Sequence, residues 1–319
     1  MCNNIKKIWL IGSGPMAIDY ARVLNQLNIN YDVIGRGIDS AKKFEQVCNK
    51  SVNVGGISNW LESNEKEPPN GCIVAVGLED LSSIAISLVE YGIKNILVEK
   101  PGGLNSIQIK KLGERTKEYN ANIYIGYNRR YYASTMKAVE IIKNNGGVLS
   151  FYFEFTEWAD EIEKINLSTK IKENWFLVNS SHVADLAFFL GGKPDQLTCY
   201  IGGKLNWHPK GSIYSGAGVS DNGALFSYQA NWASSGRWGV EVLTKSSRLI
   251  LKPLEKLQII PKGSIQSEYV DIDDELDKKF KPGLYHQTRA FINNDQSNLC
   301  TIHEQIQNLN YYEKINSGV

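Results

Sequence analysis

The residue types that could carry out chemistry are concentrated in a few short motifs. Gly12-Ser13-Gly14-Pro15-Met16-Ala17 fits the pattern G-x-G-x-x-[GA], and it stands between a short apolar run and a helix-like segment. In this arrangement the first glycine permits a tight turn, the second lets the backbone approach a pyrophosphate, and Ala17 keeps the helix close to the strand. The helix N-terminus adds N–H groups and the positive end of its dipole. The motif predicts a dinucleotide site formed by Gly12, Gly14, Pro15, Met16 and Ala17.

The end of the next strand bears on which dinucleotide is bound. An acidic residue there would bind the ribose 2′-hydroxyl of NAD, whereas an arginine nearby would accommodate the 2′-phosphate of NADP. The chain has Gly35 at the acidic position and Arg36 directly after it, with Ser40 close behind. Two alternatives stay open, namely Arg36 as an exposed turn residue and Asp39 as a ribose contact, although we expect Asp39 to cap the following helix. The sequence favours NADP as the cofactor, with NAD as the alternative.

A lysine follows another strand-like run. Residues 95–98 lead into Glu99-Lys100-Pro101-Gly102-Gly103. Ligands of open α/β sheets bind beyond the carboxyl ends of the strands, so Glu99 and Lys100 are expected beside the cofactor. A lysine in that place could donate or accept the proton of a reacting hydroxyl group. We predict Lys100 as a catalytic residue that also touches the cofactor, and Glu99 as part of the cofactor site.

The elements that must position these motifs follow two different patterns of apolar residues along the chain. From residue 6 to residue 125, short apolar runs alternate with longer amphipathic segments, which predicts a parallel sheet covered by helices. After residue 126 the pattern changes, because residues 150–156 alternate as in a half-buried antiparallel strand and further strand-like runs follow. We predict an α/β protein with a Rossmann dinucleotide-binding domain at 1–124. A substrate-binding and oligomerisation α/β domain with an open, mostly antiparallel sheet is predicted at 125–319, and residues 262–281 are predicted as a surface connection.

Composition excludes several other classes of protein. The 319 residues include 35 Lys and Arg against 34 Asp and Glu, so the formal net charge is +1. A general nucleic-acid binder would need a basic excess, and neither a polybasic anchor nor a long apolar run indicates a membrane protein. The five cysteines are scattered without metal-ligand spacing, which suits a reducing compartment. We predict a cytoplasmic protein with no nucleic-acid, membrane or metal partner.

Four motifs together resemble the glucose–fructose oxidoreductase, inositol dehydrogenase and rhizopine catabolism family, written Gfo/Idh/MocA. Besides the glycine motif and Glu99-Lys100-Pro101, they are Gly126-Tyr127-Asn128-Arg129-Arg130 and Ser180-Ser181-His182-Val183-Ala184-Asp185-Leu186, and their order agrees along nearly the whole chain. Glu-Lys-Pro after a Rossmann fingerprint is fairly specific, and the other motifs support it. The resemblance implies NAD(P)-dependent oxidation or reduction of a sugar, polyol or nucleotide sugar. It also implies an open sheet that commonly forms dimers or tetramers.

The resemblance assigns roles to three positions. Lys100 corresponds to the active-site lysine of the family, and His182 corresponds to its active-site histidine, which together with the lysine handles the hydroxyl proton. Asn128, just past the last Rossmann strand, would lie near the nicotinamide and is predicted to bind the cofactor. The alternative for His182 is a histidine whose hydrogen bonds are satisfied inside the core.

One position departs from the family pattern. Many members carry an aspartate four residues before the histidine, but this chain has Val178 there. Asn179 is the nearest polar substitute, and Asp185 is another possible partner for His182 because it is three residues further along the same expected helix. The identity of the general base therefore stays open.

Further side chains are candidates for holding a substrate. The predicted substrate-binding residues are Arg129, Tyr131, Trp158, Trp175, Asn179 and Asp185. An aromatic ring suits the apolar face of a sugar, although a place in the core or in an interface is the alternative for both tryptophans. We expect Trp232 and Trp238 at an oligomer interface. Glu157 is expected at a solvated strand end.

These observations predict an NAD(P)-dependent sugar or nucleotide-sugar dehydrogenase or reductase. In the reaction, a hydride would move between nicotinamide and a carbinol or carbonyl carbon. Two alternatives stay open. Gly35-Arg36 favours an NADPH-dependent ketosugar reductase, and Val178 leaves room for a catalytically silent NAD(P)-binding sugar sensor, which Lys100 and His182 argue against. The expected partners are a small sugar substrate and further copies of the chain, in a homodimer or homotetramer formed through the C-terminal sheet.

Overall fold

The computed structural model describes residues 7–63 and 68–318. The chain divides into two compact units: Met1–Asn128 with Leu276–Ile306 form the first, and Arg129–Glu275 with Gln307–Val319 form the second. The chain therefore returns to the first unit late in the sequence before it ends in the second. The predicted domains at 1–124 and 125–319 stay a prediction, and residues 276–306 group with the first unit.

The first unit is built on a seven-stranded sheet, sheet A. Its strands are β1 (Lys7–Ile11), β2 (Asn30–Gly35), β3 (Val52–Val54), β4 (Gly71–Val74), β5 (Asn95–Val98), β6 (Asn122–Ile125) and β15 (Cys300–Thr301). Its helices are α1 (Pro15–Gln26), α2 (Ile38–Cys48), α3 (Gly56–Ser63), α4 (Leu81–Glu90), α5 (Ser106–Glu118) and α11 (Leu284–Ile292). Three helices span the boundaries between the two units: η1 (Asn128–Tyr131), α10 (Glu275–Lys279) and α12 (Ile302–Ser317).

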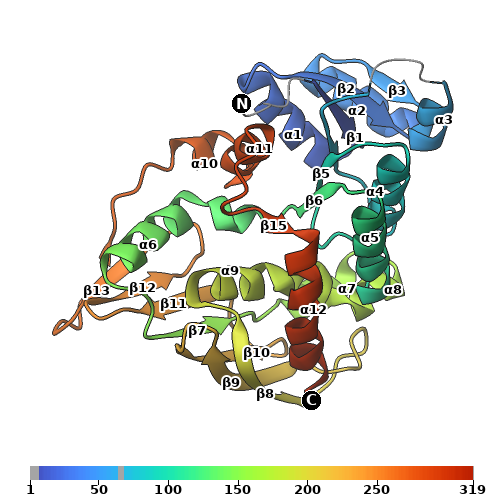
Figure 1. Cartoon of the computed structure of the whole chain (residues 1–319). Helices are drawn as coiled ribbons and strands as arrows, with labels where there is room; N and C mark the ends of the chain where they lie inside the picture. The colour runs from blue at the N-terminus through green and yellow to red at the C-terminus, as the bar shows by residue number, and fades with distance from the viewer. Residues whose placement is uncertain (1–6, 64–67, 319) are drawn as a thin grey trace. The chain divides into compact units, whose positions relative to one another are not determined.

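The strand order of sheet A is β15-β6-β5-β4-β1-β2-β3, and only β15 runs antiparallel to its neighbour. The parallel strands β1, β4 and β5 are buried on both faces, as their uninterrupted apolar runs require. The order reverses between β1 and β4, which is the switch point where doubly wound sheets bind ligands. In Figure 1, the late elements α11 and β15 lie beside the early elements α1 and β6, and the strand pairing of β15 with β6 agrees. The Rossmann prediction is confirmed.

The second unit is built on an eight-stranded sheet, sheet B. Its strands are β7 (Ser150–Glu154), β8 (Pro194–Gly202), β9 (Ile213–Ser220), β10 (Leu225–Asn231), β11 (Gly239–Leu243), β12 (Ser247–Leu251), β13 (Gln258–Pro261) and β14 (Glu268–Tyr269). Its other elements are α6 (Ala133–Asn144), α7 (Ala159–Lys164), α8 (Thr169–Glu173), the π-helical turn η2 (Phe176–Ser180) and α9 (Ser181–Gly191). Part of the predicted surface connection at 262–281 thus forms β14 and α10.

Sheet B has the order β14-β13-β12-β11-β7-β10-β9-β8, and all pairs are antiparallel except β7 with β10. This order confirms the predicted open, mostly antiparallel sheet. Phe151, Phe153 and Phe155 alternate onto one face, where they are buried against aromatic side chains of α9 and β10. Tyr200 and Leu225 remain exposed by 68% and 62%.

Strand β9 was not expected from the sequence, because its run I-Y-S-G-A-G-V-S is rich in glycine. A Cβ added at Gly216 would lie 2.4 Å from the ring of Tyr228, and one at Gly218 would lie 2.0 Å from the carbonyl oxygen of Gln196. The glycines make room for an aromatic side chain of the neighbouring strand β10 and for the backbone of β8. A pattern based on local propensity cannot register this requirement.

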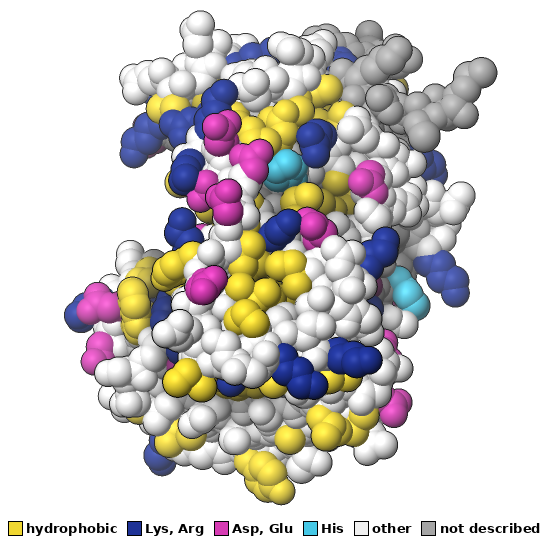
Figure 2. Space-filling model, turned by 90° about the vertical axis from the view of Figure 1, so that its left-hand side faces the viewer, with side chains coloured by type: hydrophobic (Ala, Val, Ile, Leu, Met, Phe, Trp, Pro, Cys, Tyr) yellow, Lys and Arg dark blue, Asp and Glu magenta, His cyan; other side chains and the backbone are white. Residues whose placement is uncertain are grey.

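Charged side chains of both signs are intermixed on the face drawn in Figure 2, in keeping with the balanced composition. Within the described ranges, no helix is both long enough and apolar enough to cross a membrane. Of the cysteines, Cys48, Cys72, Cys199 and Cys300 are free thiols, and Cys2 lies outside the described residues.

Candidate functional site

A cavity of about 770 Å³ lies beyond the carboxyl ends of β1, β2 and β4. Its lining includes most of the predicted cofactor residues, namely Gly12, Gly14, Pro15, Met16, Gly35 and Arg36. Ala17 lies behind them, fully buried in α1, where a small side chain allows the helix to approach the sheet. The glycine motif that the sequence singled out therefore lines the cavity at the switch point.

The backbone around this cavity has the features that a pyrophosphate needs. Gly12 has φ of +120°, and a Cβ there would lie 2.2 Å from the carbonyl oxygen of Ala75, so only glycine fits. At Gly14 an added Cβ would meet nothing within 4 Å, which leaves open space next to the backbone. Helix α1 starts at Pro15 with no side-chain cap and no acidic residue in its first turn. Its N–H groups can therefore face an anion.

The end of β2 has no carboxylate of the kind that NAD-specific sites use. A Cβ at Gly35 would lie 2.8 Å from Val52 Cγ1 and 2.9 Å from Ser13 Oγ, so a larger residue would require these two side chains to shift. Arg36 reaches the cavity instead, and its Nη1 donates to Asp80 Oδ2 at 3.2 Å. The hydroxyl groups of Ser13 and Ser40 lie 2.8 Å apart on the same side.

The expected capping role of Asp39 is wrong. The N-cap of α2 is Gly37, which has extended backbone and no side-chain cap, and Asp39 lies exposed in the first turn. A glycine N-cap leaves the N-terminal N–H groups of α2 without a local side-chain acceptor.

Glu99 is half-buried directly after β5, and it contacts groups from distant parts of the first unit. Tyr20 Oη of α1 donates to its Oε1 at 2.7 Å. Burial raises the pKa of Glu99, although the hydrogen bond from Tyr20 and the charges of Lys281 and Lys100 oppose that rise. Burial and the neighbouring Glu99 also raise the pKa of Tyr20. A carboxyl group held between a tyrosine and two lysines is a constellation in which protons can be retained or exchanged.

Residues 276–306 supply functional neighbours that sequence reasoning missed. Lys281 Nζ contacts Met16 Sδ, and Asn128 Nδ2 donates to the carbonyl oxygen of Pro282 at 2.8 Å. The amide of Asn128 thus anchors this returning segment. Gln305 Nε2 donates to the carbonyl oxygen of Pro101, in the cis Lys100-Pro101 turn, at 3.0 Å. No local motif marks these residues, because their partners are more than 150 positions away.

A second cluster lies in the second unit, at one end of β7 and β11. The two strands are antiparallel neighbours with Glu154 opposite Gly239, so the residues after β7 meet the residues before β11. Trp158 Nε1 donates to the carbonyl oxygen of Gly236 at 3.0 Å, which ties the two segments together. Trp158 is 56% exposed, so its ring is available to a ligand.

Glu157 is the carboxylate of this cluster, and its expected place at a solvated strand end is wrong. It is 1% exposed, and its Oε1 accepts hydrogen bonds from Asn179 Nδ2 at 2.9 Å and Ser180 Oγ at 2.7 Å. Arg237 Nη1 lies 3.4 Å from its Oε2. The π-helical turn η2 presents Asn179 and Ser180 just before α9, which carries the buried His182. Glu157, which precedes His182 by 25 positions, therefore lies beside the segment in which Val178 stands at the position of the family aspartate.

Trp238 is the centre of the same cluster. The guanidinium of Arg237 lies over its ring at 4.4 Å, and that of Arg129 lies over it at 4.8 Å. The ring of His182 is 6.2 Å away between centroids. The structure therefore brings Arg129, Trp158, Asn179 and His182 of the predicted site into one cluster, and adds Glu157, Arg237 and Trp238 to it.

The sequence predicted Trp232 and Trp238 at an oligomer interface, and this prediction is wrong. They are only 1% and 6% exposed. Trp232 Nε1 donates to the carbonyl oxygen of Phe155 at 3.1 Å, and its ring packs among Trp207, His208 and Tyr214. Their position beside a turn was visible in the sequence, but the inward direction of both side chains was not.

The remaining predicted substrate residues lie elsewhere in the second unit. Asp185 is 1% exposed and accepts two hydrogen bonds from Arg130, at 2.8 Å and 2.6 Å. Trp175 is buried, and its ring packs on that of Trp207 at 6.1 Å. Tyr131 is 5% exposed. These contacts are those of core residues.

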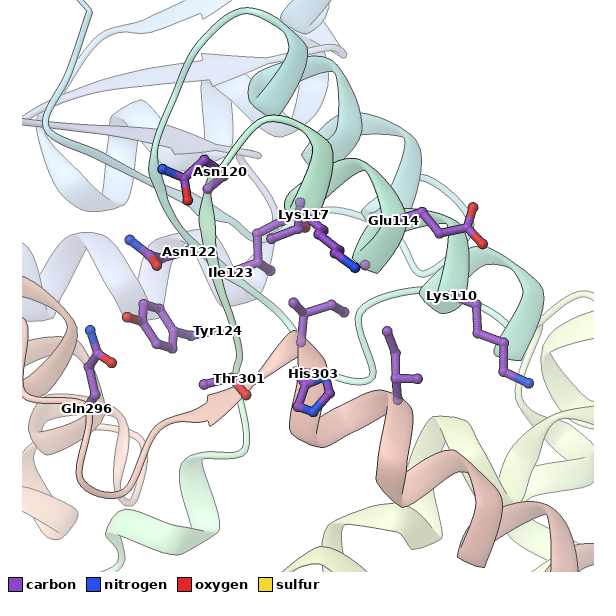
Figure 3. Close-up of a pocket in the computed structure, with 15 residues that line it drawn as sticks. Lys110, Glu114, Lys117, Asn120, Asn122, Ile123, Tyr124, Gln296, Thr301 and His303 are labelled. Atoms are coloured by element: carbon purple, nitrogen blue, oxygen red, sulfur yellow. The ribbon is translucent and has the colours of Figure 1, made fainter.

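Another cavity in the first unit, of about 640 Å³, lies at the edge of sheet A and is drawn in Figure 3. Side chains of α5 form one wall, with Lys117 turned toward the cavity, and His303 of α12 faces it from below. Ile123 and Ile306 also line this cavity. None of the predicted site residues lines this cavity.

Comparison with known proteins gives a remote relative and many similar folds. No protein-family model matches the chain. Oxidoreductase P35 of Formosa agariphila is 25% identical over 218 residues, and the match spans 63% of this chain and 63% of that protein. A putative NADPH-dependent oxidoreductase from Desulfitobacterium hafniense has a TM-score of 0.80 at 16% identity, over 99% of this chain and 96% of that one.

UDP-N-acetylglucosamine 3-dehydrogenase GnnA from Acidithiobacillus ferrooxidans has a TM-score of 0.74 at 13% identity, over 98% of this chain and 97% of that chain. Both solved structures are oxidoreductases of the Gfo/Idh/MocA type. The likeness covers nearly the whole chain. The chain has the fold of the Gfo/Idh/MocA-type NAD(P)-binding oxidoreductases.

Proposed function

We propose that the protein is an NAD(P)-dependent oxidoreductase acting on a sugar, polyol or nucleotide sugar. The observation that carries the proposal is the cavity at the switch point of sheet A. It combines open space beside Gly14 with an uncapped helix N-terminus. A bound nicotinamide would supply the hydride chemistry that no side chain can perform. The substrate class is supported by the name of the similar UDP-N-acetylglucosamine 3-dehydrogenase.

Within this proposal, the residues of the first unit bind and orient the cofactor. The backbone at Gly12 and Gly14 and the N-terminus of α1 hold the pyrophosphate. Arg36 and Ser40 hold a 2′-phosphate, which makes NADP the preferred cofactor and NAD the alternative. The absence of a side chain at Gly35 supports this preference, because it removes the acceptor for a ribose 2′-hydroxyl.

The proton of the reacting hydroxyl group is assigned to Lys100 and His182. Glu157 supplies the carboxylate that Val178 cannot, through its hydrogen bonds to Asn179 and Ser180 in the turn before the histidine. It acts as a positioning residue for this turn. Retention of the lysine and the histidine supports an enzyme over a catalytically silent sensor.

A ketosugar reductase using NADPH is the second candidate, and the guanidinium of Arg36 at the adenosine end of the cavity favours it. The same proposal includes a cytoplasmic location, which the free thiols support. It also includes a homo-oligomer formed through the open face of sheet B, where Tyr200 and Leu225 are exposed.

The test begins with the cofactor. The full chain is titrated with NADPH and NADH in separate experiments, followed by fluorescence of the reduced nicotinamide, and tighter binding of NADPH is expected. Hydride transfer is then followed by absorbance across a panel of sugars, polyols, sugar acids and nucleotide sugars, in both directions. Lys100→Ala should slow turnover by about 100-fold or more while the cofactor still binds. Failure of every panel member to react would contradict the enzyme proposal and favour the sensor.

A further inference from the structure

Arg129 carries a positive charge that makes no ion pair among the described residues, and Glu255 and Glu157 act on it only from beyond ion-pair distance. Its Nε is buried, and among the described residues the guanidinium has neither a hydrogen-bond acceptor nor a carboxylate within ion-pair distance. Burial lowers the pKa of Arg129. The group is held by cation–π contacts, at 4.8 Å from the ring of Trp238 and 5.8 Å from that of Tyr132. A half-buried guanidinium without an ion-pair partner is available to an anion from outside the protein.

The next residue shows how this chain treats an arginine that serves the fold. Arg130 is 3% exposed, and its Nε and Nη2 donate to the two oxygens of Asp185. This bidentate pair satisfies the charge internally. Two adjacent arginines of the second unit thus differ in their partners: Arg130 forms an ion pair with a carboxylate, and Arg129 does not.

The nearby carboxylate of Glu157 does not form an ion pair with Arg129. Glu157 is engaged by Asn179 and Ser180 at one oxygen and by Arg237 at the other. Arg237 adds a second guanidinium over the same indole. Glu255 also acts on Arg129, but from beyond ion-pair distance, so neither carboxylate pairs with its guanidinium.

A second buried donor in the cluster also lacks an acceptor. Trp238 Nε1 is buried and has no hydrogen-bond partner in the described structure. An indole N–H and a guanidinium can only donate, so both groups call for an acceptor from outside the protein. Buried donors without acceptors are rare in native proteins and require an explanation.

We propose that Arg129, assisted by Arg237 and Trp238, binds an anionic group of the substrate, either a carboxylate or a phosphate. The inference rests on the proposed function and narrows its substrate class to acidic sugars, meaning sugar acids, sugar phosphates or nucleotide sugars. The planar guanidinium matches the paired oxygens of both groups. The exposed ring of Trp158 can pack against the apolar face of the sugar.

The test compares binding of probes that share a glucose-type ring and differ in whether they carry a carboxylate, a phosphate or no anionic group. Glucose, glucuronate, glucose 6-phosphate and UDP-glucose are titrated into the full chain, and binding is followed by calorimetry and by tryptophan fluorescence. At least one acidic probe should bind tenfold or more tightly than glucose, and the probe that does so distinguishes the carboxylate from the phosphate. Equal affinity for glucose and all the acidic probes, or no binding by any acidic probe, would overturn the proposal.

Variants then assign the charge to Arg129. Arg129→Gln should weaken binding of the acidic probe by about 10- to 100-fold. Arg129→Lys, which keeps the charge but loses the planar fork, should give an intermediate affinity. Arg248→Gln is the matched control, because Arg248 lies on β12 and pairs with Glu241 on the strand beside it. Unchanged affinity in Arg129→Gln would contradict the assignment.

Thermal unfolding separates binding from folding. Because Arg129 makes no ion pair among the described residues, Arg129→Gln should unfold at a temperature close to that of the wild type. Binding is measured without turnover, so a chain that binds acidic probes through Arg129 but transfers no hydride would contradict only the proposed function. A chain that turns over neutral sugars without using Arg129 would contradict only the anion site.

Discussion

Arg36 Nη1 and Asp80 Oδ2 lie 3.2 Å apart, and both residues line the cavity of the glycine motif. The side chain of Arg36 is 82% exposed and that of Asp80 is 38% exposed. A pair this accessible to water contributes little to stability. Its importance is for ligand choice, because a 2′-phosphate would have to compete with Asp80 for the same guanidinium.

Replacing Asp80 should therefore change the cofactor preference. In Asp80→Asn the competing charge is removed, so affinity for NADPH should rise severalfold while affinity for NADH changes less. Arg36→Ala should weaken NADPH binding by about 10- to 100-fold, the usual effect of losing a charge-assisted hydrogen bond to phosphate. Fluorescence titration of both cofactors gives the ratio, and equal losses for NADH and NADPH in Arg36→Ala would contradict the phosphate contact.

Gly35 should resist conversion to the acidic residue of NAD-specific sites. Gly35→Asp is expected to destabilise the first unit by about 1–3 kcal/mol rather than to create NADH binding, because its Cβ would clash with Val52 and Ser13. Thermal unfolding and NADH titration measure the two effects. Gly37→Ala is the control, since a Cβ there would meet only Ser40 Oγ at 3.5 Å. A stable Gly35→Asp variant with tight NADH binding would refute the steric argument.

Glu157→Gln tests the carboxylate before His182. Glutamine keeps the shape but removes the charge that holds Asn179, Ser180 and Arg237, so kcat should fall by about tenfold or more with a smaller change in KM. Some loss of stability is expected as well. Glu241→Gln is the control, because this residue pairs with Arg248 away from the cluster. A change confined to unfolding temperature, with normal kcat, would reduce Glu157 to a structural role.

His208 should make the second unit sensitive to acid. It is fully buried beside Trp207 and Trp232, and burial lowers its pKa below the ordinary value near 6.5. The folded state therefore favours neutral histidine, and stability is complete above about pH 6.5 and is lost as the pH falls toward the lowered pKa. The unfolding temperature of the wild type should drop more steeply than that of His208→Phe between pH 6.5 and 5. His303→Gln should retain the wild-type slope.

Local patterns were sufficient for the architecture. The spacing of apolar runs predicted the parallel sheet, and the change of period near residue 126 predicted the second, mostly antiparallel sheet. The glycine motif could be placed because its requirements are local: a positive φ at Gly12 and open space at Gly14 belong to the backbone itself. Strand β9 could not be predicted, because its glycines are required by contacts with Tyr228 and with the backbone of β8.

Some features of the candidate site also follow from local motifs, and others depend on long-range packing. By itself the sequence determined the cofactor cavity and the candidates Lys100 and His182, because each sits in a contiguous motif whose order is preserved. Only the tertiary structure decided which distant groups meet: Lys281 beside Glu99, Glu157 beside Asn179, and a carboxylate in an ion pair with Arg130 but not with Arg129. These relationships depend on the direction and burial of side chains that are brought together by long-range packing, and no local periodicity encodes them.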